Sequence, residues 1–346
     1  MNKIKVVIID DSALVRKVLT QILNSTADIE VCASAPNAYL GRDYIVQYKP
    51  DVLLLDIEMP KMDGLTFLEK LMTHYPMPVI IVSSLSENES ETALRAIELA
   101  ALEVMKKPGG SYSIVDMKEQ LIDKIRSVAR VRIFPKLQKK ITEEKVKKSS
   151  SLIRTTNKVV AIGASTGGTV ALTELLTKLP ANIPPIVIVQ HMPAGFTYQF
   201  AERLNSLCKF EVKEAVHGDY VLSGRVLLAP GNKHMVIKRD GANYYVELKN
   251  GPLVFHQRPS VEVLFYSMAK YVGKNAVGVI LTGMGKDGAS GLLEMKQSGA
   301  YTIAQDEKSS VVFGMPKEAI NLGAVDDIYP LGDIPSAIMK HIDKFR

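Results

Sequence analysis

Hydrophobic positions in the first 130 residues follow two alternating patterns. Short runs of branched apolar residues, typical of buried strands, are separated by longer segments whose apolar residues recur with the period of a helix. Five such strand–helix pairs predict a parallel sheet covered by helices on both faces, with right-handed crossovers. The predicted strands are Lys5–Asp10, Ile29–Ser34, Val52–Asp56, Val79–Ser83 and Glu103–Lys106, and the predicted helices begin near Ala13, Tyr39, Leu65, Glu89 and Ile114.

The second half of the chain repeats this alternation less regularly. Its apolar runs and helical segments again favour an α/β unit with a doubly wound sheet. The pair Asp240-Gly241 lies between two alternating segments, His234–Arg239 and Asn243–Leu248, and predicts a short antiparallel hairpin. The predicted sheet strands are Val159–Gly163, Pro185–His191, Arg225–Ala229, Ala276–Thr282 and Tyr301–Gln305, and the predicted helices are Val170–Lys178, Phe196–Ser206, Val261–Tyr271, Gly288–Ser298 and Ile334–Phe345.

A basic segment separates the two halves. The chain has 346 residues, more than one hydrophobic core usually serves, so two domains are expected. Between Arg130 and Lys158 there are ten basic and two acidic residues, and no helical apolar stripe. We therefore predict a first domain at residues 1–130, a flexible basic linker at 131–156 and a second domain at 157–346.

The formal net charge of +6 originates in this linker. The segment Arg130–Lys158 carries +8, which leaves −2 for the rest of the chain, so a basic face that binds nucleic acid is not expected. The apolar runs are too short to span a membrane, and the N-terminus has no secretory signal. We predict a cytoplasmic protein, monomeric and not inserted in the membrane.

Polar side chains gather at the strand ends of the first half. Asp10 and Asp11 follow the first predicted strand, Asp56 and Ser83 end the third and fourth, and Lys107 follows the fifth. Because parallel strands end at one edge of a sheet, three carboxylates would lie beside a hydroxyl and an ammonium group. Oxygen ligands with room for water suit Mg²⁺. The cluster predicts an aspartyl-phosphate site, in which Asp56 is the nucleophile and Mg²⁺, Lys107 and Ser83 contact the phosphoryl group.

These segments also carry a family resemblance. The motifs are Asp10-Asp11, Leu55–Gly64, Val82-Ser83-Ser84 and Lys106-Lys107-Pro108. With them, residues 1 to about 127 resemble a response-regulator receiver domain, which implies a five-stranded flavodoxin-like fold and phosphorylation of Asp56 by a histidine kinase. The resemblance also implies that Mg²⁺ is held by Asp10, Asp11, Asp56 and the backbone carbonyl of Glu58. Receivers commonly have an aromatic residue three positions before the lysine, and this chain departs from that pattern with Val104.

A serine stands on a glycine-rich turn in the second half. The run from Gly163 to Gly168 follows a predicted strand and precedes a predicted helix. A Gly-x-Ser-x-Gly turn in that place lifts its serine, here Ser165, out of the sheet edge. The N–H groups at the helix start suit the anionic oxygen that develops at an ester carbon. The run lacks the glycine spacing of a dinucleotide site and the lysine of a P-loop, so no cofactor is predicted here.

A serine nucleophile needs a base and a carboxylate. Among six histidines, His191 ends a strongly apolar predicted strand, as Ser165 follows one, and is the best candidate base. His234 and His256 remain candidates for a substrate pocket. Asp287 and Asp306 both follow predicted strands, and the pattern alone does not choose between them as the third member of a triad.

The second half resembles the catalytic domain of chemotaxis protein-glutamate methylesterases. The motifs are Ala164–Gly168, Gln190–Pro193, Ala229–His234, Arg258–Val261, Leu281–Gly288 and Ala304–Glu307. The resemblance implies a triad of Ser165, His191 and Asp287. It also implies an oxyanion or substrate site that includes the backbone N–H of Met284 and the neighbouring Thr166.

The resemblance implies substrates and partners as well. The implied substrate is a glutamate γ-methyl ester on chemoreceptors, hydrolysed to glutamate and methanol during chemotactic adaptation, and receptor glutamines would be deamidated in the same site. Two alternatives stay open on the residues alone. One is a receiver-gated serine protease or small-ester hydrolase, and the other is a non-catalytic binding protein controlled by phosphorylation.

Overall fold

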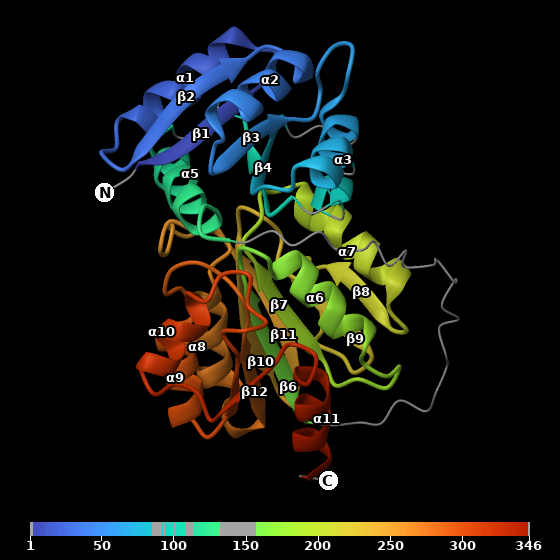
Figure 1. Cartoon of the computed structure of the whole chain (residues 1–346). Helices are drawn as coiled ribbons and strands as arrows, with labels where there is room; N and C mark the ends of the chain where they lie inside the picture. Colours follow the sequence, from blue (N-terminus) through green and yellow to red (C-terminus); the bar gives the residue numbers. More distant parts are fainter. Residues whose placement is uncertain are drawn as a thin grey trace. The chain divides into compact units, whose positions relative to one another are not determined.

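The structure is a computed structural model that describes residues 3–84, 92, 94–97, 99, 101–107, 114–131 and 157–344. The chain divides into two compact units, Met1–Lys140 and Ile141–Arg346, each with its own sheet (Figure 1). Apart from Val131, the predicted linker 131–156 lies outside the described residues, as does the start of the helix predicted near Glu89. The linker and the exact domain limits therefore stay predictions.

The first unit is a five-stranded parallel sheet with helices packed against it. Its elements are β1 Ile4–Ile9, α1 Ala13–Asn24, β2 Ile29–Ala35, α2 Ala38–Tyr48, β3 Val52–Asp56, α3 Gly64–His74, β4 Val79–Ser83, β5 Glu103–Lys106 and α5 Ile114–Val128. The strand order is β2-β1-β3-β4-β5. Side chains of α1 and α5, such as Leu19 and Leu121, form one core with Ile8, Leu54 and Ile80 of the sheet. The predicted flavodoxin-like fold is confirmed.

Local sequence explains where these elements begin and end. Every residue of β3 and β4 is buried, as expected for inner strands of a parallel sheet that is covered on both faces. The N-caps of helices α1, α2 and α3 are Ser12, Asn37 and Asp63, whose side chains each accept a backbone N–H three residues further on. These caps let each helix start directly after a strand end or turn.

The second unit is a seven-stranded parallel sheet with a separate hairpin. Its strands are β6 Val159–Ala164, β7 Ile186–Gln190, β8 Glu211–Glu214, β9 Arg225–Leu228, β12 Ala276–Ile280, β13 Tyr301–Gln305 and β14 Asp327–Tyr329, and the hairpin is β10 His234–Asp240 and β11 Asn243–Lys249. Its helices are α6 Gly168–Thr177, α7 Phe196–Leu207, α8 Val261–Tyr271, the 3₁₀ turn η1 Gly273–Asn275, α9 Ala289–Gln297, α10 Met315–Asn321 and α11 Ile334–Lys344. Figure 1 shows α8, α9 and α10 on one face of this sheet and α6 and α11 on the other.

The strand order of the second sheet determines where its site lies. The order is β14-β13-β12-β6-β7-β9-β8, so β7 lies on one side of β6 and β12 on the other, and the order reverses at β6. In such sheets, ligands bind at the carboxyl ends of the strands where the order reverses. The loops that follow β12, β6 and β7 meet at this point. The doubly wound sheet and the hairpin confirm the expected fold class. In the described part of the chain, no helix is both long and apolar enough to cross a bilayer.

Candidate active site

Ser165 occupies the first residue after β6, at the centre of the sheet edge. Its backbone N–H donates to the carbonyl of Thr282 at 3.0 Å, which ties the serine turn to the loop after β12. Gly167 has a φ of 77°, and a Cβ on Gly168 would lie 2.1 Å from the side-chain oxygen of Gln190. Both glycines are therefore required by the tight turn that carries the 6 % exposed Ser165.

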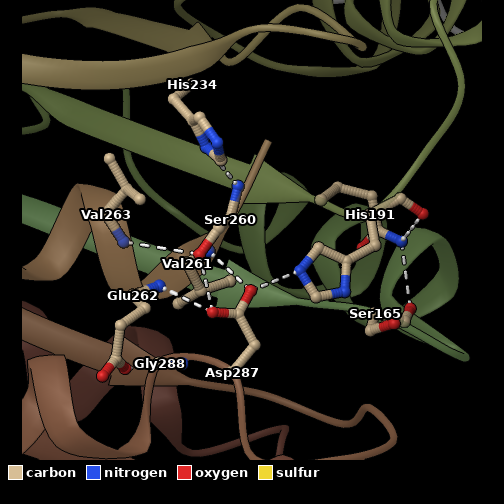
Figure 2. Close-up of polar contacts among 10 residues, drawn as sticks. Ser165, His191, His234, Ser260, Val261, Glu262, Val263, Asp287 and Gly288 are labelled. Atoms are coloured by element: carbon tan, nitrogen blue, oxygen red, sulfur yellow. Dashed lines mark hydrogen bonds and ion pairs between the residues drawn. The ribbon is translucent and has the colours of Figure 1, made fainter. Parts of the chain in front are cut away.

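His191 and Asp287 form a buried pair beside this turn. The Nε2 atom of His191 lies 2.7 Å from Oδ2 of Asp287, and the two residues are 5 % and 2 % exposed. The backbone N–H of His191 donates to the carbonyl of Ala164, next to the serine, at 3.2 Å. Figure 2 shows the imidazole between Asp287 and the Ser165 turn. The loops after β7, β6 and β12 thus bring the three predicted residues together.

The carboxylate of Asp287 accepts three further hydrogen bonds. Its donors are the hydroxyl of Ser260 at 2.7 Å, the N–H of Val261 at 2.8 Å and the N–H of Glu262 at 2.9 Å (Figure 2). These N–H groups belong to the first turn of α8, whose positive dipole end favours an ionised carboxylate. Asp306, the other candidate, accepts instead from the N–H and hydroxyl of Ser309 in its own loop.

The contact between Asp287 and His191 decides which ring nitrogen is available as a base. An ionised carboxylate can only accept, so Nε2 carries the proton of this hydrogen bond. In the neutral imidazole the lone pair then lies on Nδ1. In the described part of the chain, no hydrogen bond joins Ser165 Oγ to His191.

The predicted oxyanion residues lie in the two loops that meet at Ser165. The hydroxyl of Thr282 donates to the carbonyl of Thr166 at 2.9 Å, and a Cβ on Gly283 would lie 2.7 Å from Cβ of Ser165. Met284 follows Gly283 directly. Within the described ranges, the backbone N–H groups of Thr166 and Met284 donate no hydrogen bond to a backbone carbonyl, so both are available to an oxyanion.

Of the two histidines considered for a substrate pocket, His234 uses both ring nitrogens in contacts with the backbone. It is 3 % exposed, its Nδ1 accepts from the N–H of Ser260 at 3.2 Å, and its Nε2 lies 2.8 Å from the carbonyl of Pro252. It therefore fixes the residue that caps α8 and contacts Asp287. His256 lies in a tight turn with a φ of 60°.

Sequence reasoning missed Ser260 and Glu262 as members of this site. Two local signals involved Ser260: it belongs to the Arg258–Val261 motif, and it stands immediately before a predicted helix, which is typical of an N-cap. Their contacts with Asp287 depend on the packing of α8 against the loop after β12. A local sequence pattern does not predict such packing.

A second cluster lies at the carboxyl edge of the first sheet. One oxygen from each of Asp10, Asp11 and Asp56 lies within 4.8 Å of the others, a spacing that could hold a metal ion. Lys107 Nζ lies 2.6 Å from Asp56 and 3.3 Å from Asp10. Burial raises the pKa of Asp56 to about 6, against the lowering effect of Lys107. Burial likewise raises the pKa of Asp10.

The other residues predicted for this cluster lie around it. Ser83 is buried at the end of β4, and its carbonyl accepts the N–H of Lys107 at 2.8 Å. Glu58 is exposed and donates its N–H to Asp56 at 3.3 Å. Val104 is 4 % exposed and packs as an ordinary core residue of β5.

Fold and sites together define a class: a receiver unit that carries a buried acidic cluster, followed by an α/β unit of the serine-hydrolase kind. Comparison with known proteins agrees for both units. The family model described as "CheB methylesterase" matches residues 160–338, and that described as "Response regulator receiver domain" matches residues 6–119. The chain belongs to the CheB methylesterase family.

Relatives match this chain over nearly its whole length. A protein of Syntrophus aciditrophicus named "Protein-glutamate methylesterase/protein-glutamine glutaminase 2" is 56% identical over 347 residues, covering 99% of this chain and all of the relative. A relative from Sulfurimonas denitrificans with the same activity name is 52% identical and covers 96% of each chain. The crystal structure of the Thermotoga maritima CheB methylesterase catalytic domain has a TM-score of 0.53 and 40% identity, covering 54% of this chain and 100% of that domain.

Proposed function

We propose that the chain is a phosphorylation-regulated protein-glutamate methylesterase that also deamidates protein glutamines. The observation that carries this proposal is the buried His191–Asp287 pair at 2.7 Å, set against the glycine turn of Ser165 at the centre of the sheet edge. This arrangement supplies a nucleophile, a base and a charge that orients the base. Family membership supplies the substrate class, glutamate γ-methyl esters of chemoreceptors.

The proposed reaction proceeds in two steps through an acyl-enzyme. Ser165 Oγ attacks the ester carbonyl carbon and passes its proton to Nδ1 of His191, because Nε2 is held by Asp287. The imidazolium returns that proton to the departing methoxide, which leaves as methanol. Water then attacks the γ-glutamyl ester of Ser165 with the same base, and glutamate and free Ser165 result.

The N–H groups of Met284 and Thr166 are the proposed donors to the oxyanion. Both belong to loops that contact Ser165, and a donor aimed at a developing negative charge stabilises it most in a buried site. Deamidation needs no further residue, since a glutamine side chain forms the same acyl-enzyme with ammonia as the leaving group.

The first unit is proposed to control this activity through Asp56. Oδ2 of Asp10 is buried and accepts no hydrogen bond from the described residues, although Lys107 lies 3.3 Å away. A carboxylate oxygen left in this state fits an oxygen-liganded divalent cation, so Asp10, Asp11, Asp56 and the carbonyl of Glu58 would hold Mg²⁺. Bound there, the ion would neutralise charge on the transferred phosphoryl group. Lys107 and Ser83 would contact the phosphoryl oxygens.

The proposed partners follow from the two activities. A chemotaxis histidine kinase would donate the phosphoryl group to Asp56, and methylated chemoreceptors would be the substrate. The proposed organisation is a receiver at residues 1–130, a basic linker at 131–156 and a catalytic domain at 157–346.

Methanol release from methylated receptor tests this proposal. The full-length chain should release methanol and should do so faster with a phosphoryl donor and Mg²⁺, while peptides and free glutamine should not be consumed. Cleavage of peptide bonds would favour the serine-protease alternative. No turnover of any of these substrates would favour a binding protein.

A further inference from the structure

A second buried carboxylate lies next to the Asp287–His191 pair. Glu262 is in the first turn of α8 and is 7 % exposed. Its Oε2 accepts the backbone N–H of Gly288 and that of Gly291, each at 3.0 Å. Gly288 follows Asp287 directly and is the N-cap of α9, so Glu262 holds the peptide next to the residue that binds His191 (Figure 2).

The contacts of Glu262 and Asp287 are reciprocal. The carboxylate of Asp287 accepts N–H groups from the start of α8, and the carboxylate of Glu262 accepts N–H groups from the start of α9. Asp287, just before α9, thus caps α8, and Glu262, in the first turn of α8, caps α9. This closed set of bonds fixes the start of α9, and therefore the backbone of Asp287, relative to α8.

The helix starts also fit together without spare space. A Cβ on Gly291 would lie 2.8 Å from Cβ of Phe265, and a Cβ on Gly288 would lie 2.4 Å from Cγ1 of Val261. Such close packing explains why small residues occupy the start of α9. In this packed region the N–H groups of Gly288 and Gly291 have Glu262 Oε2 as their acceptor, and a buried N–H that loses its acceptor is costly.

The two carboxylates carry like charges, which makes a purely stabilising role a poor explanation. Burial raises the pKa of Glu262, the N–H of Gly291 lowers it, and the charge of Asp287 raises it again. What Glu262 provides at this position is an acceptor oxygen for the peptide that follows Asp287.

We propose that Glu262 is a positioning residue for the triad: it fixes the peptide between Asp287 and Gly288 so that Oδ2 of Asp287 meets Nε2 of His191. This inference rests on the proposed function, because it assigns Glu262 to the orientation of the same base. Glu262 touches neither the substrate nor Ser165 in this account and acts only through Asp287.

The test compares Glu262→Ala with Glu262→Gln in the full-length protein. The alanine variant loses the acceptor, and a displacement of about 1 Å at a reacting group costs roughly 100-fold, so its kcat for methanol release should fall by about 10- to 100-fold while KM changes little. The glutamine variant keeps an oxygen for both N–H groups and should recover most of that loss.

Asp326→Ala is a matched control in the same unit. Its Oδ2 accepts the N–H and hydroxyl of Thr302 at 2.9 and 3.0 Å, at the amino end of β13 and hence at the opposite edge from Ser165. This variant also loses a carboxylate that accepts a backbone N–H. Its thermal midpoint should fall, while its kcat below that midpoint should equal that of the unmodified protein.

Asp287→Ala separates this inference from the proposed function. If Asp287→Ala retains full activity, the proposed triad is wrong. If Asp287→Ala is inactive at the level expected for a lost triad member but Glu262→Ala keeps normal kcat, Glu262 has no positioning role. In the Asp287→Ala background, Glu262→Ala should lower the residual rate less than twofold, because its effect passes through Asp287. A full additional loss in the double variant would overturn the inference.

Discussion

The two strand-edge sites of this chain use buried aspartates in opposite ways. Asp287 accepts four hydrogen bonds, one of them from His191. In the acidic cluster, Oδ2 of Asp10 accepts no hydrogen bond within the described residues, and burial raises the pKa of Asp56. A carboxylate supplied with donors is fixed and can orient a base, whereas one left short of donors has room for a cation or a phosphoryl group.

The aspartate of the second unit is held by fixed hydrogen-bond donors, whereas the aspartates of the first unit have fewer donors and can respond to a bound ion or phosphoryl group. Asp287 depends on residues of α8 and on His191, all of which the fold provides. Asp10 and Asp56 share a single ammonium group, that of Lys107. Substitutions in the second unit should therefore alter the chemical step itself, and those in the first unit should alter its control.

The largest expected effect follows removal of the nucleophile. Ser165→Ala should lower the rate of methanol release by about 10⁴-fold or more, because only oxyanion and binding contributions remain. Ser206→Ala, on the exposed end of α7, is the control and should not change the rate. Methanol release by Ser165→Ala at the normal rate would contradict the assignment.

The next largest effect distinguishes the two candidate carboxylates. Asp287→Asn should lower kcat by about 10³- to 10⁴-fold, because an amide no longer enforces the tautomer that leaves Nδ1 of His191 as the base. Asp306→Asn is the matched control and should stay within a few-fold of the unmodified protein. The reverse result would place the orienting role on Asp306 and refute the role given to Asp287.

Control through the first unit should be smaller. Couplings between sites typically amount to about 5- to 150-fold, and Asp56→Asn should abolish any activation by a phosphoryl donor in Mg²⁺. Asp51→Asn, which changes an exposed carboxylate of the same unit, should respond to the donor normally. An Asp56→Asn variant that is still activated would show that another residue accepts the phosphoryl group.

The smallest effect concerns stability and its pH dependence. The folded pKa of Asp56, about 6, lies above the ordinary value of 3.8, so the folded state binds the proton more tightly than the unfolded state. Stability of the first unit should therefore decrease as the pH rises from about 4 to 6, by up to about 3 kcal/mol. Asp56→Asn should remove most of this decrease.

Hydrogen exchange of the amides of β3 and β4 in urea, measured with a chelator present, would report the unfolding of the first unit within the full-length chain. Added Mg²⁺ should restore the stability of the unmodified protein at pH 7.5 but not that of Asp56→Asn. A stability that rises between pH 4 and 6, or that ignores Mg²⁺ in both proteins, would contradict the contrast between the two sites.

The fold was largely predictable because apolar periodicity reports buried strands directly. All five strands of the first sheet were predicted to within one residue at each end. The elements that were missed, β8, η1, α10 and β14, are short. Strand β8 is the edge sequence Glu211–Glu214, in which only Val212 is apolar, and the seven residues of α10 are too few to show a helical period.

The site was only partly predictable because strand order is not a local property. Asp287 and Asp306 each follow a strand, but β12 lies next to β6 whereas β13 lies one strand further out. The loop after β12 bonds to Ser165 through Thr282 and carries Asp287 to His191. The loop after β13 also reaches the serine turn, where Val311 packs against Gly167, but its Asp306 bonds to Ser309 in the same loop. Ser260 and Glu262 escaped notice for the same reason, since they reach Asp287 through the packing of α8 against α9.

The most direct test of the central claim is the reactivity of Ser165 itself. A fluorophosphonate reagent labels serines that an adjacent base has activated, and peptide mass spectrometry identifies the labelled residue. The account predicts that Ser165 alone is labelled at stoichiometric level, and that Asp287→Asn slows labelling by a factor similar to its loss of kcat while Asp306→Asn does not. Labelling at another serine, or equal labelling rates in unmodified protein and Asp287→Asn, would contradict it.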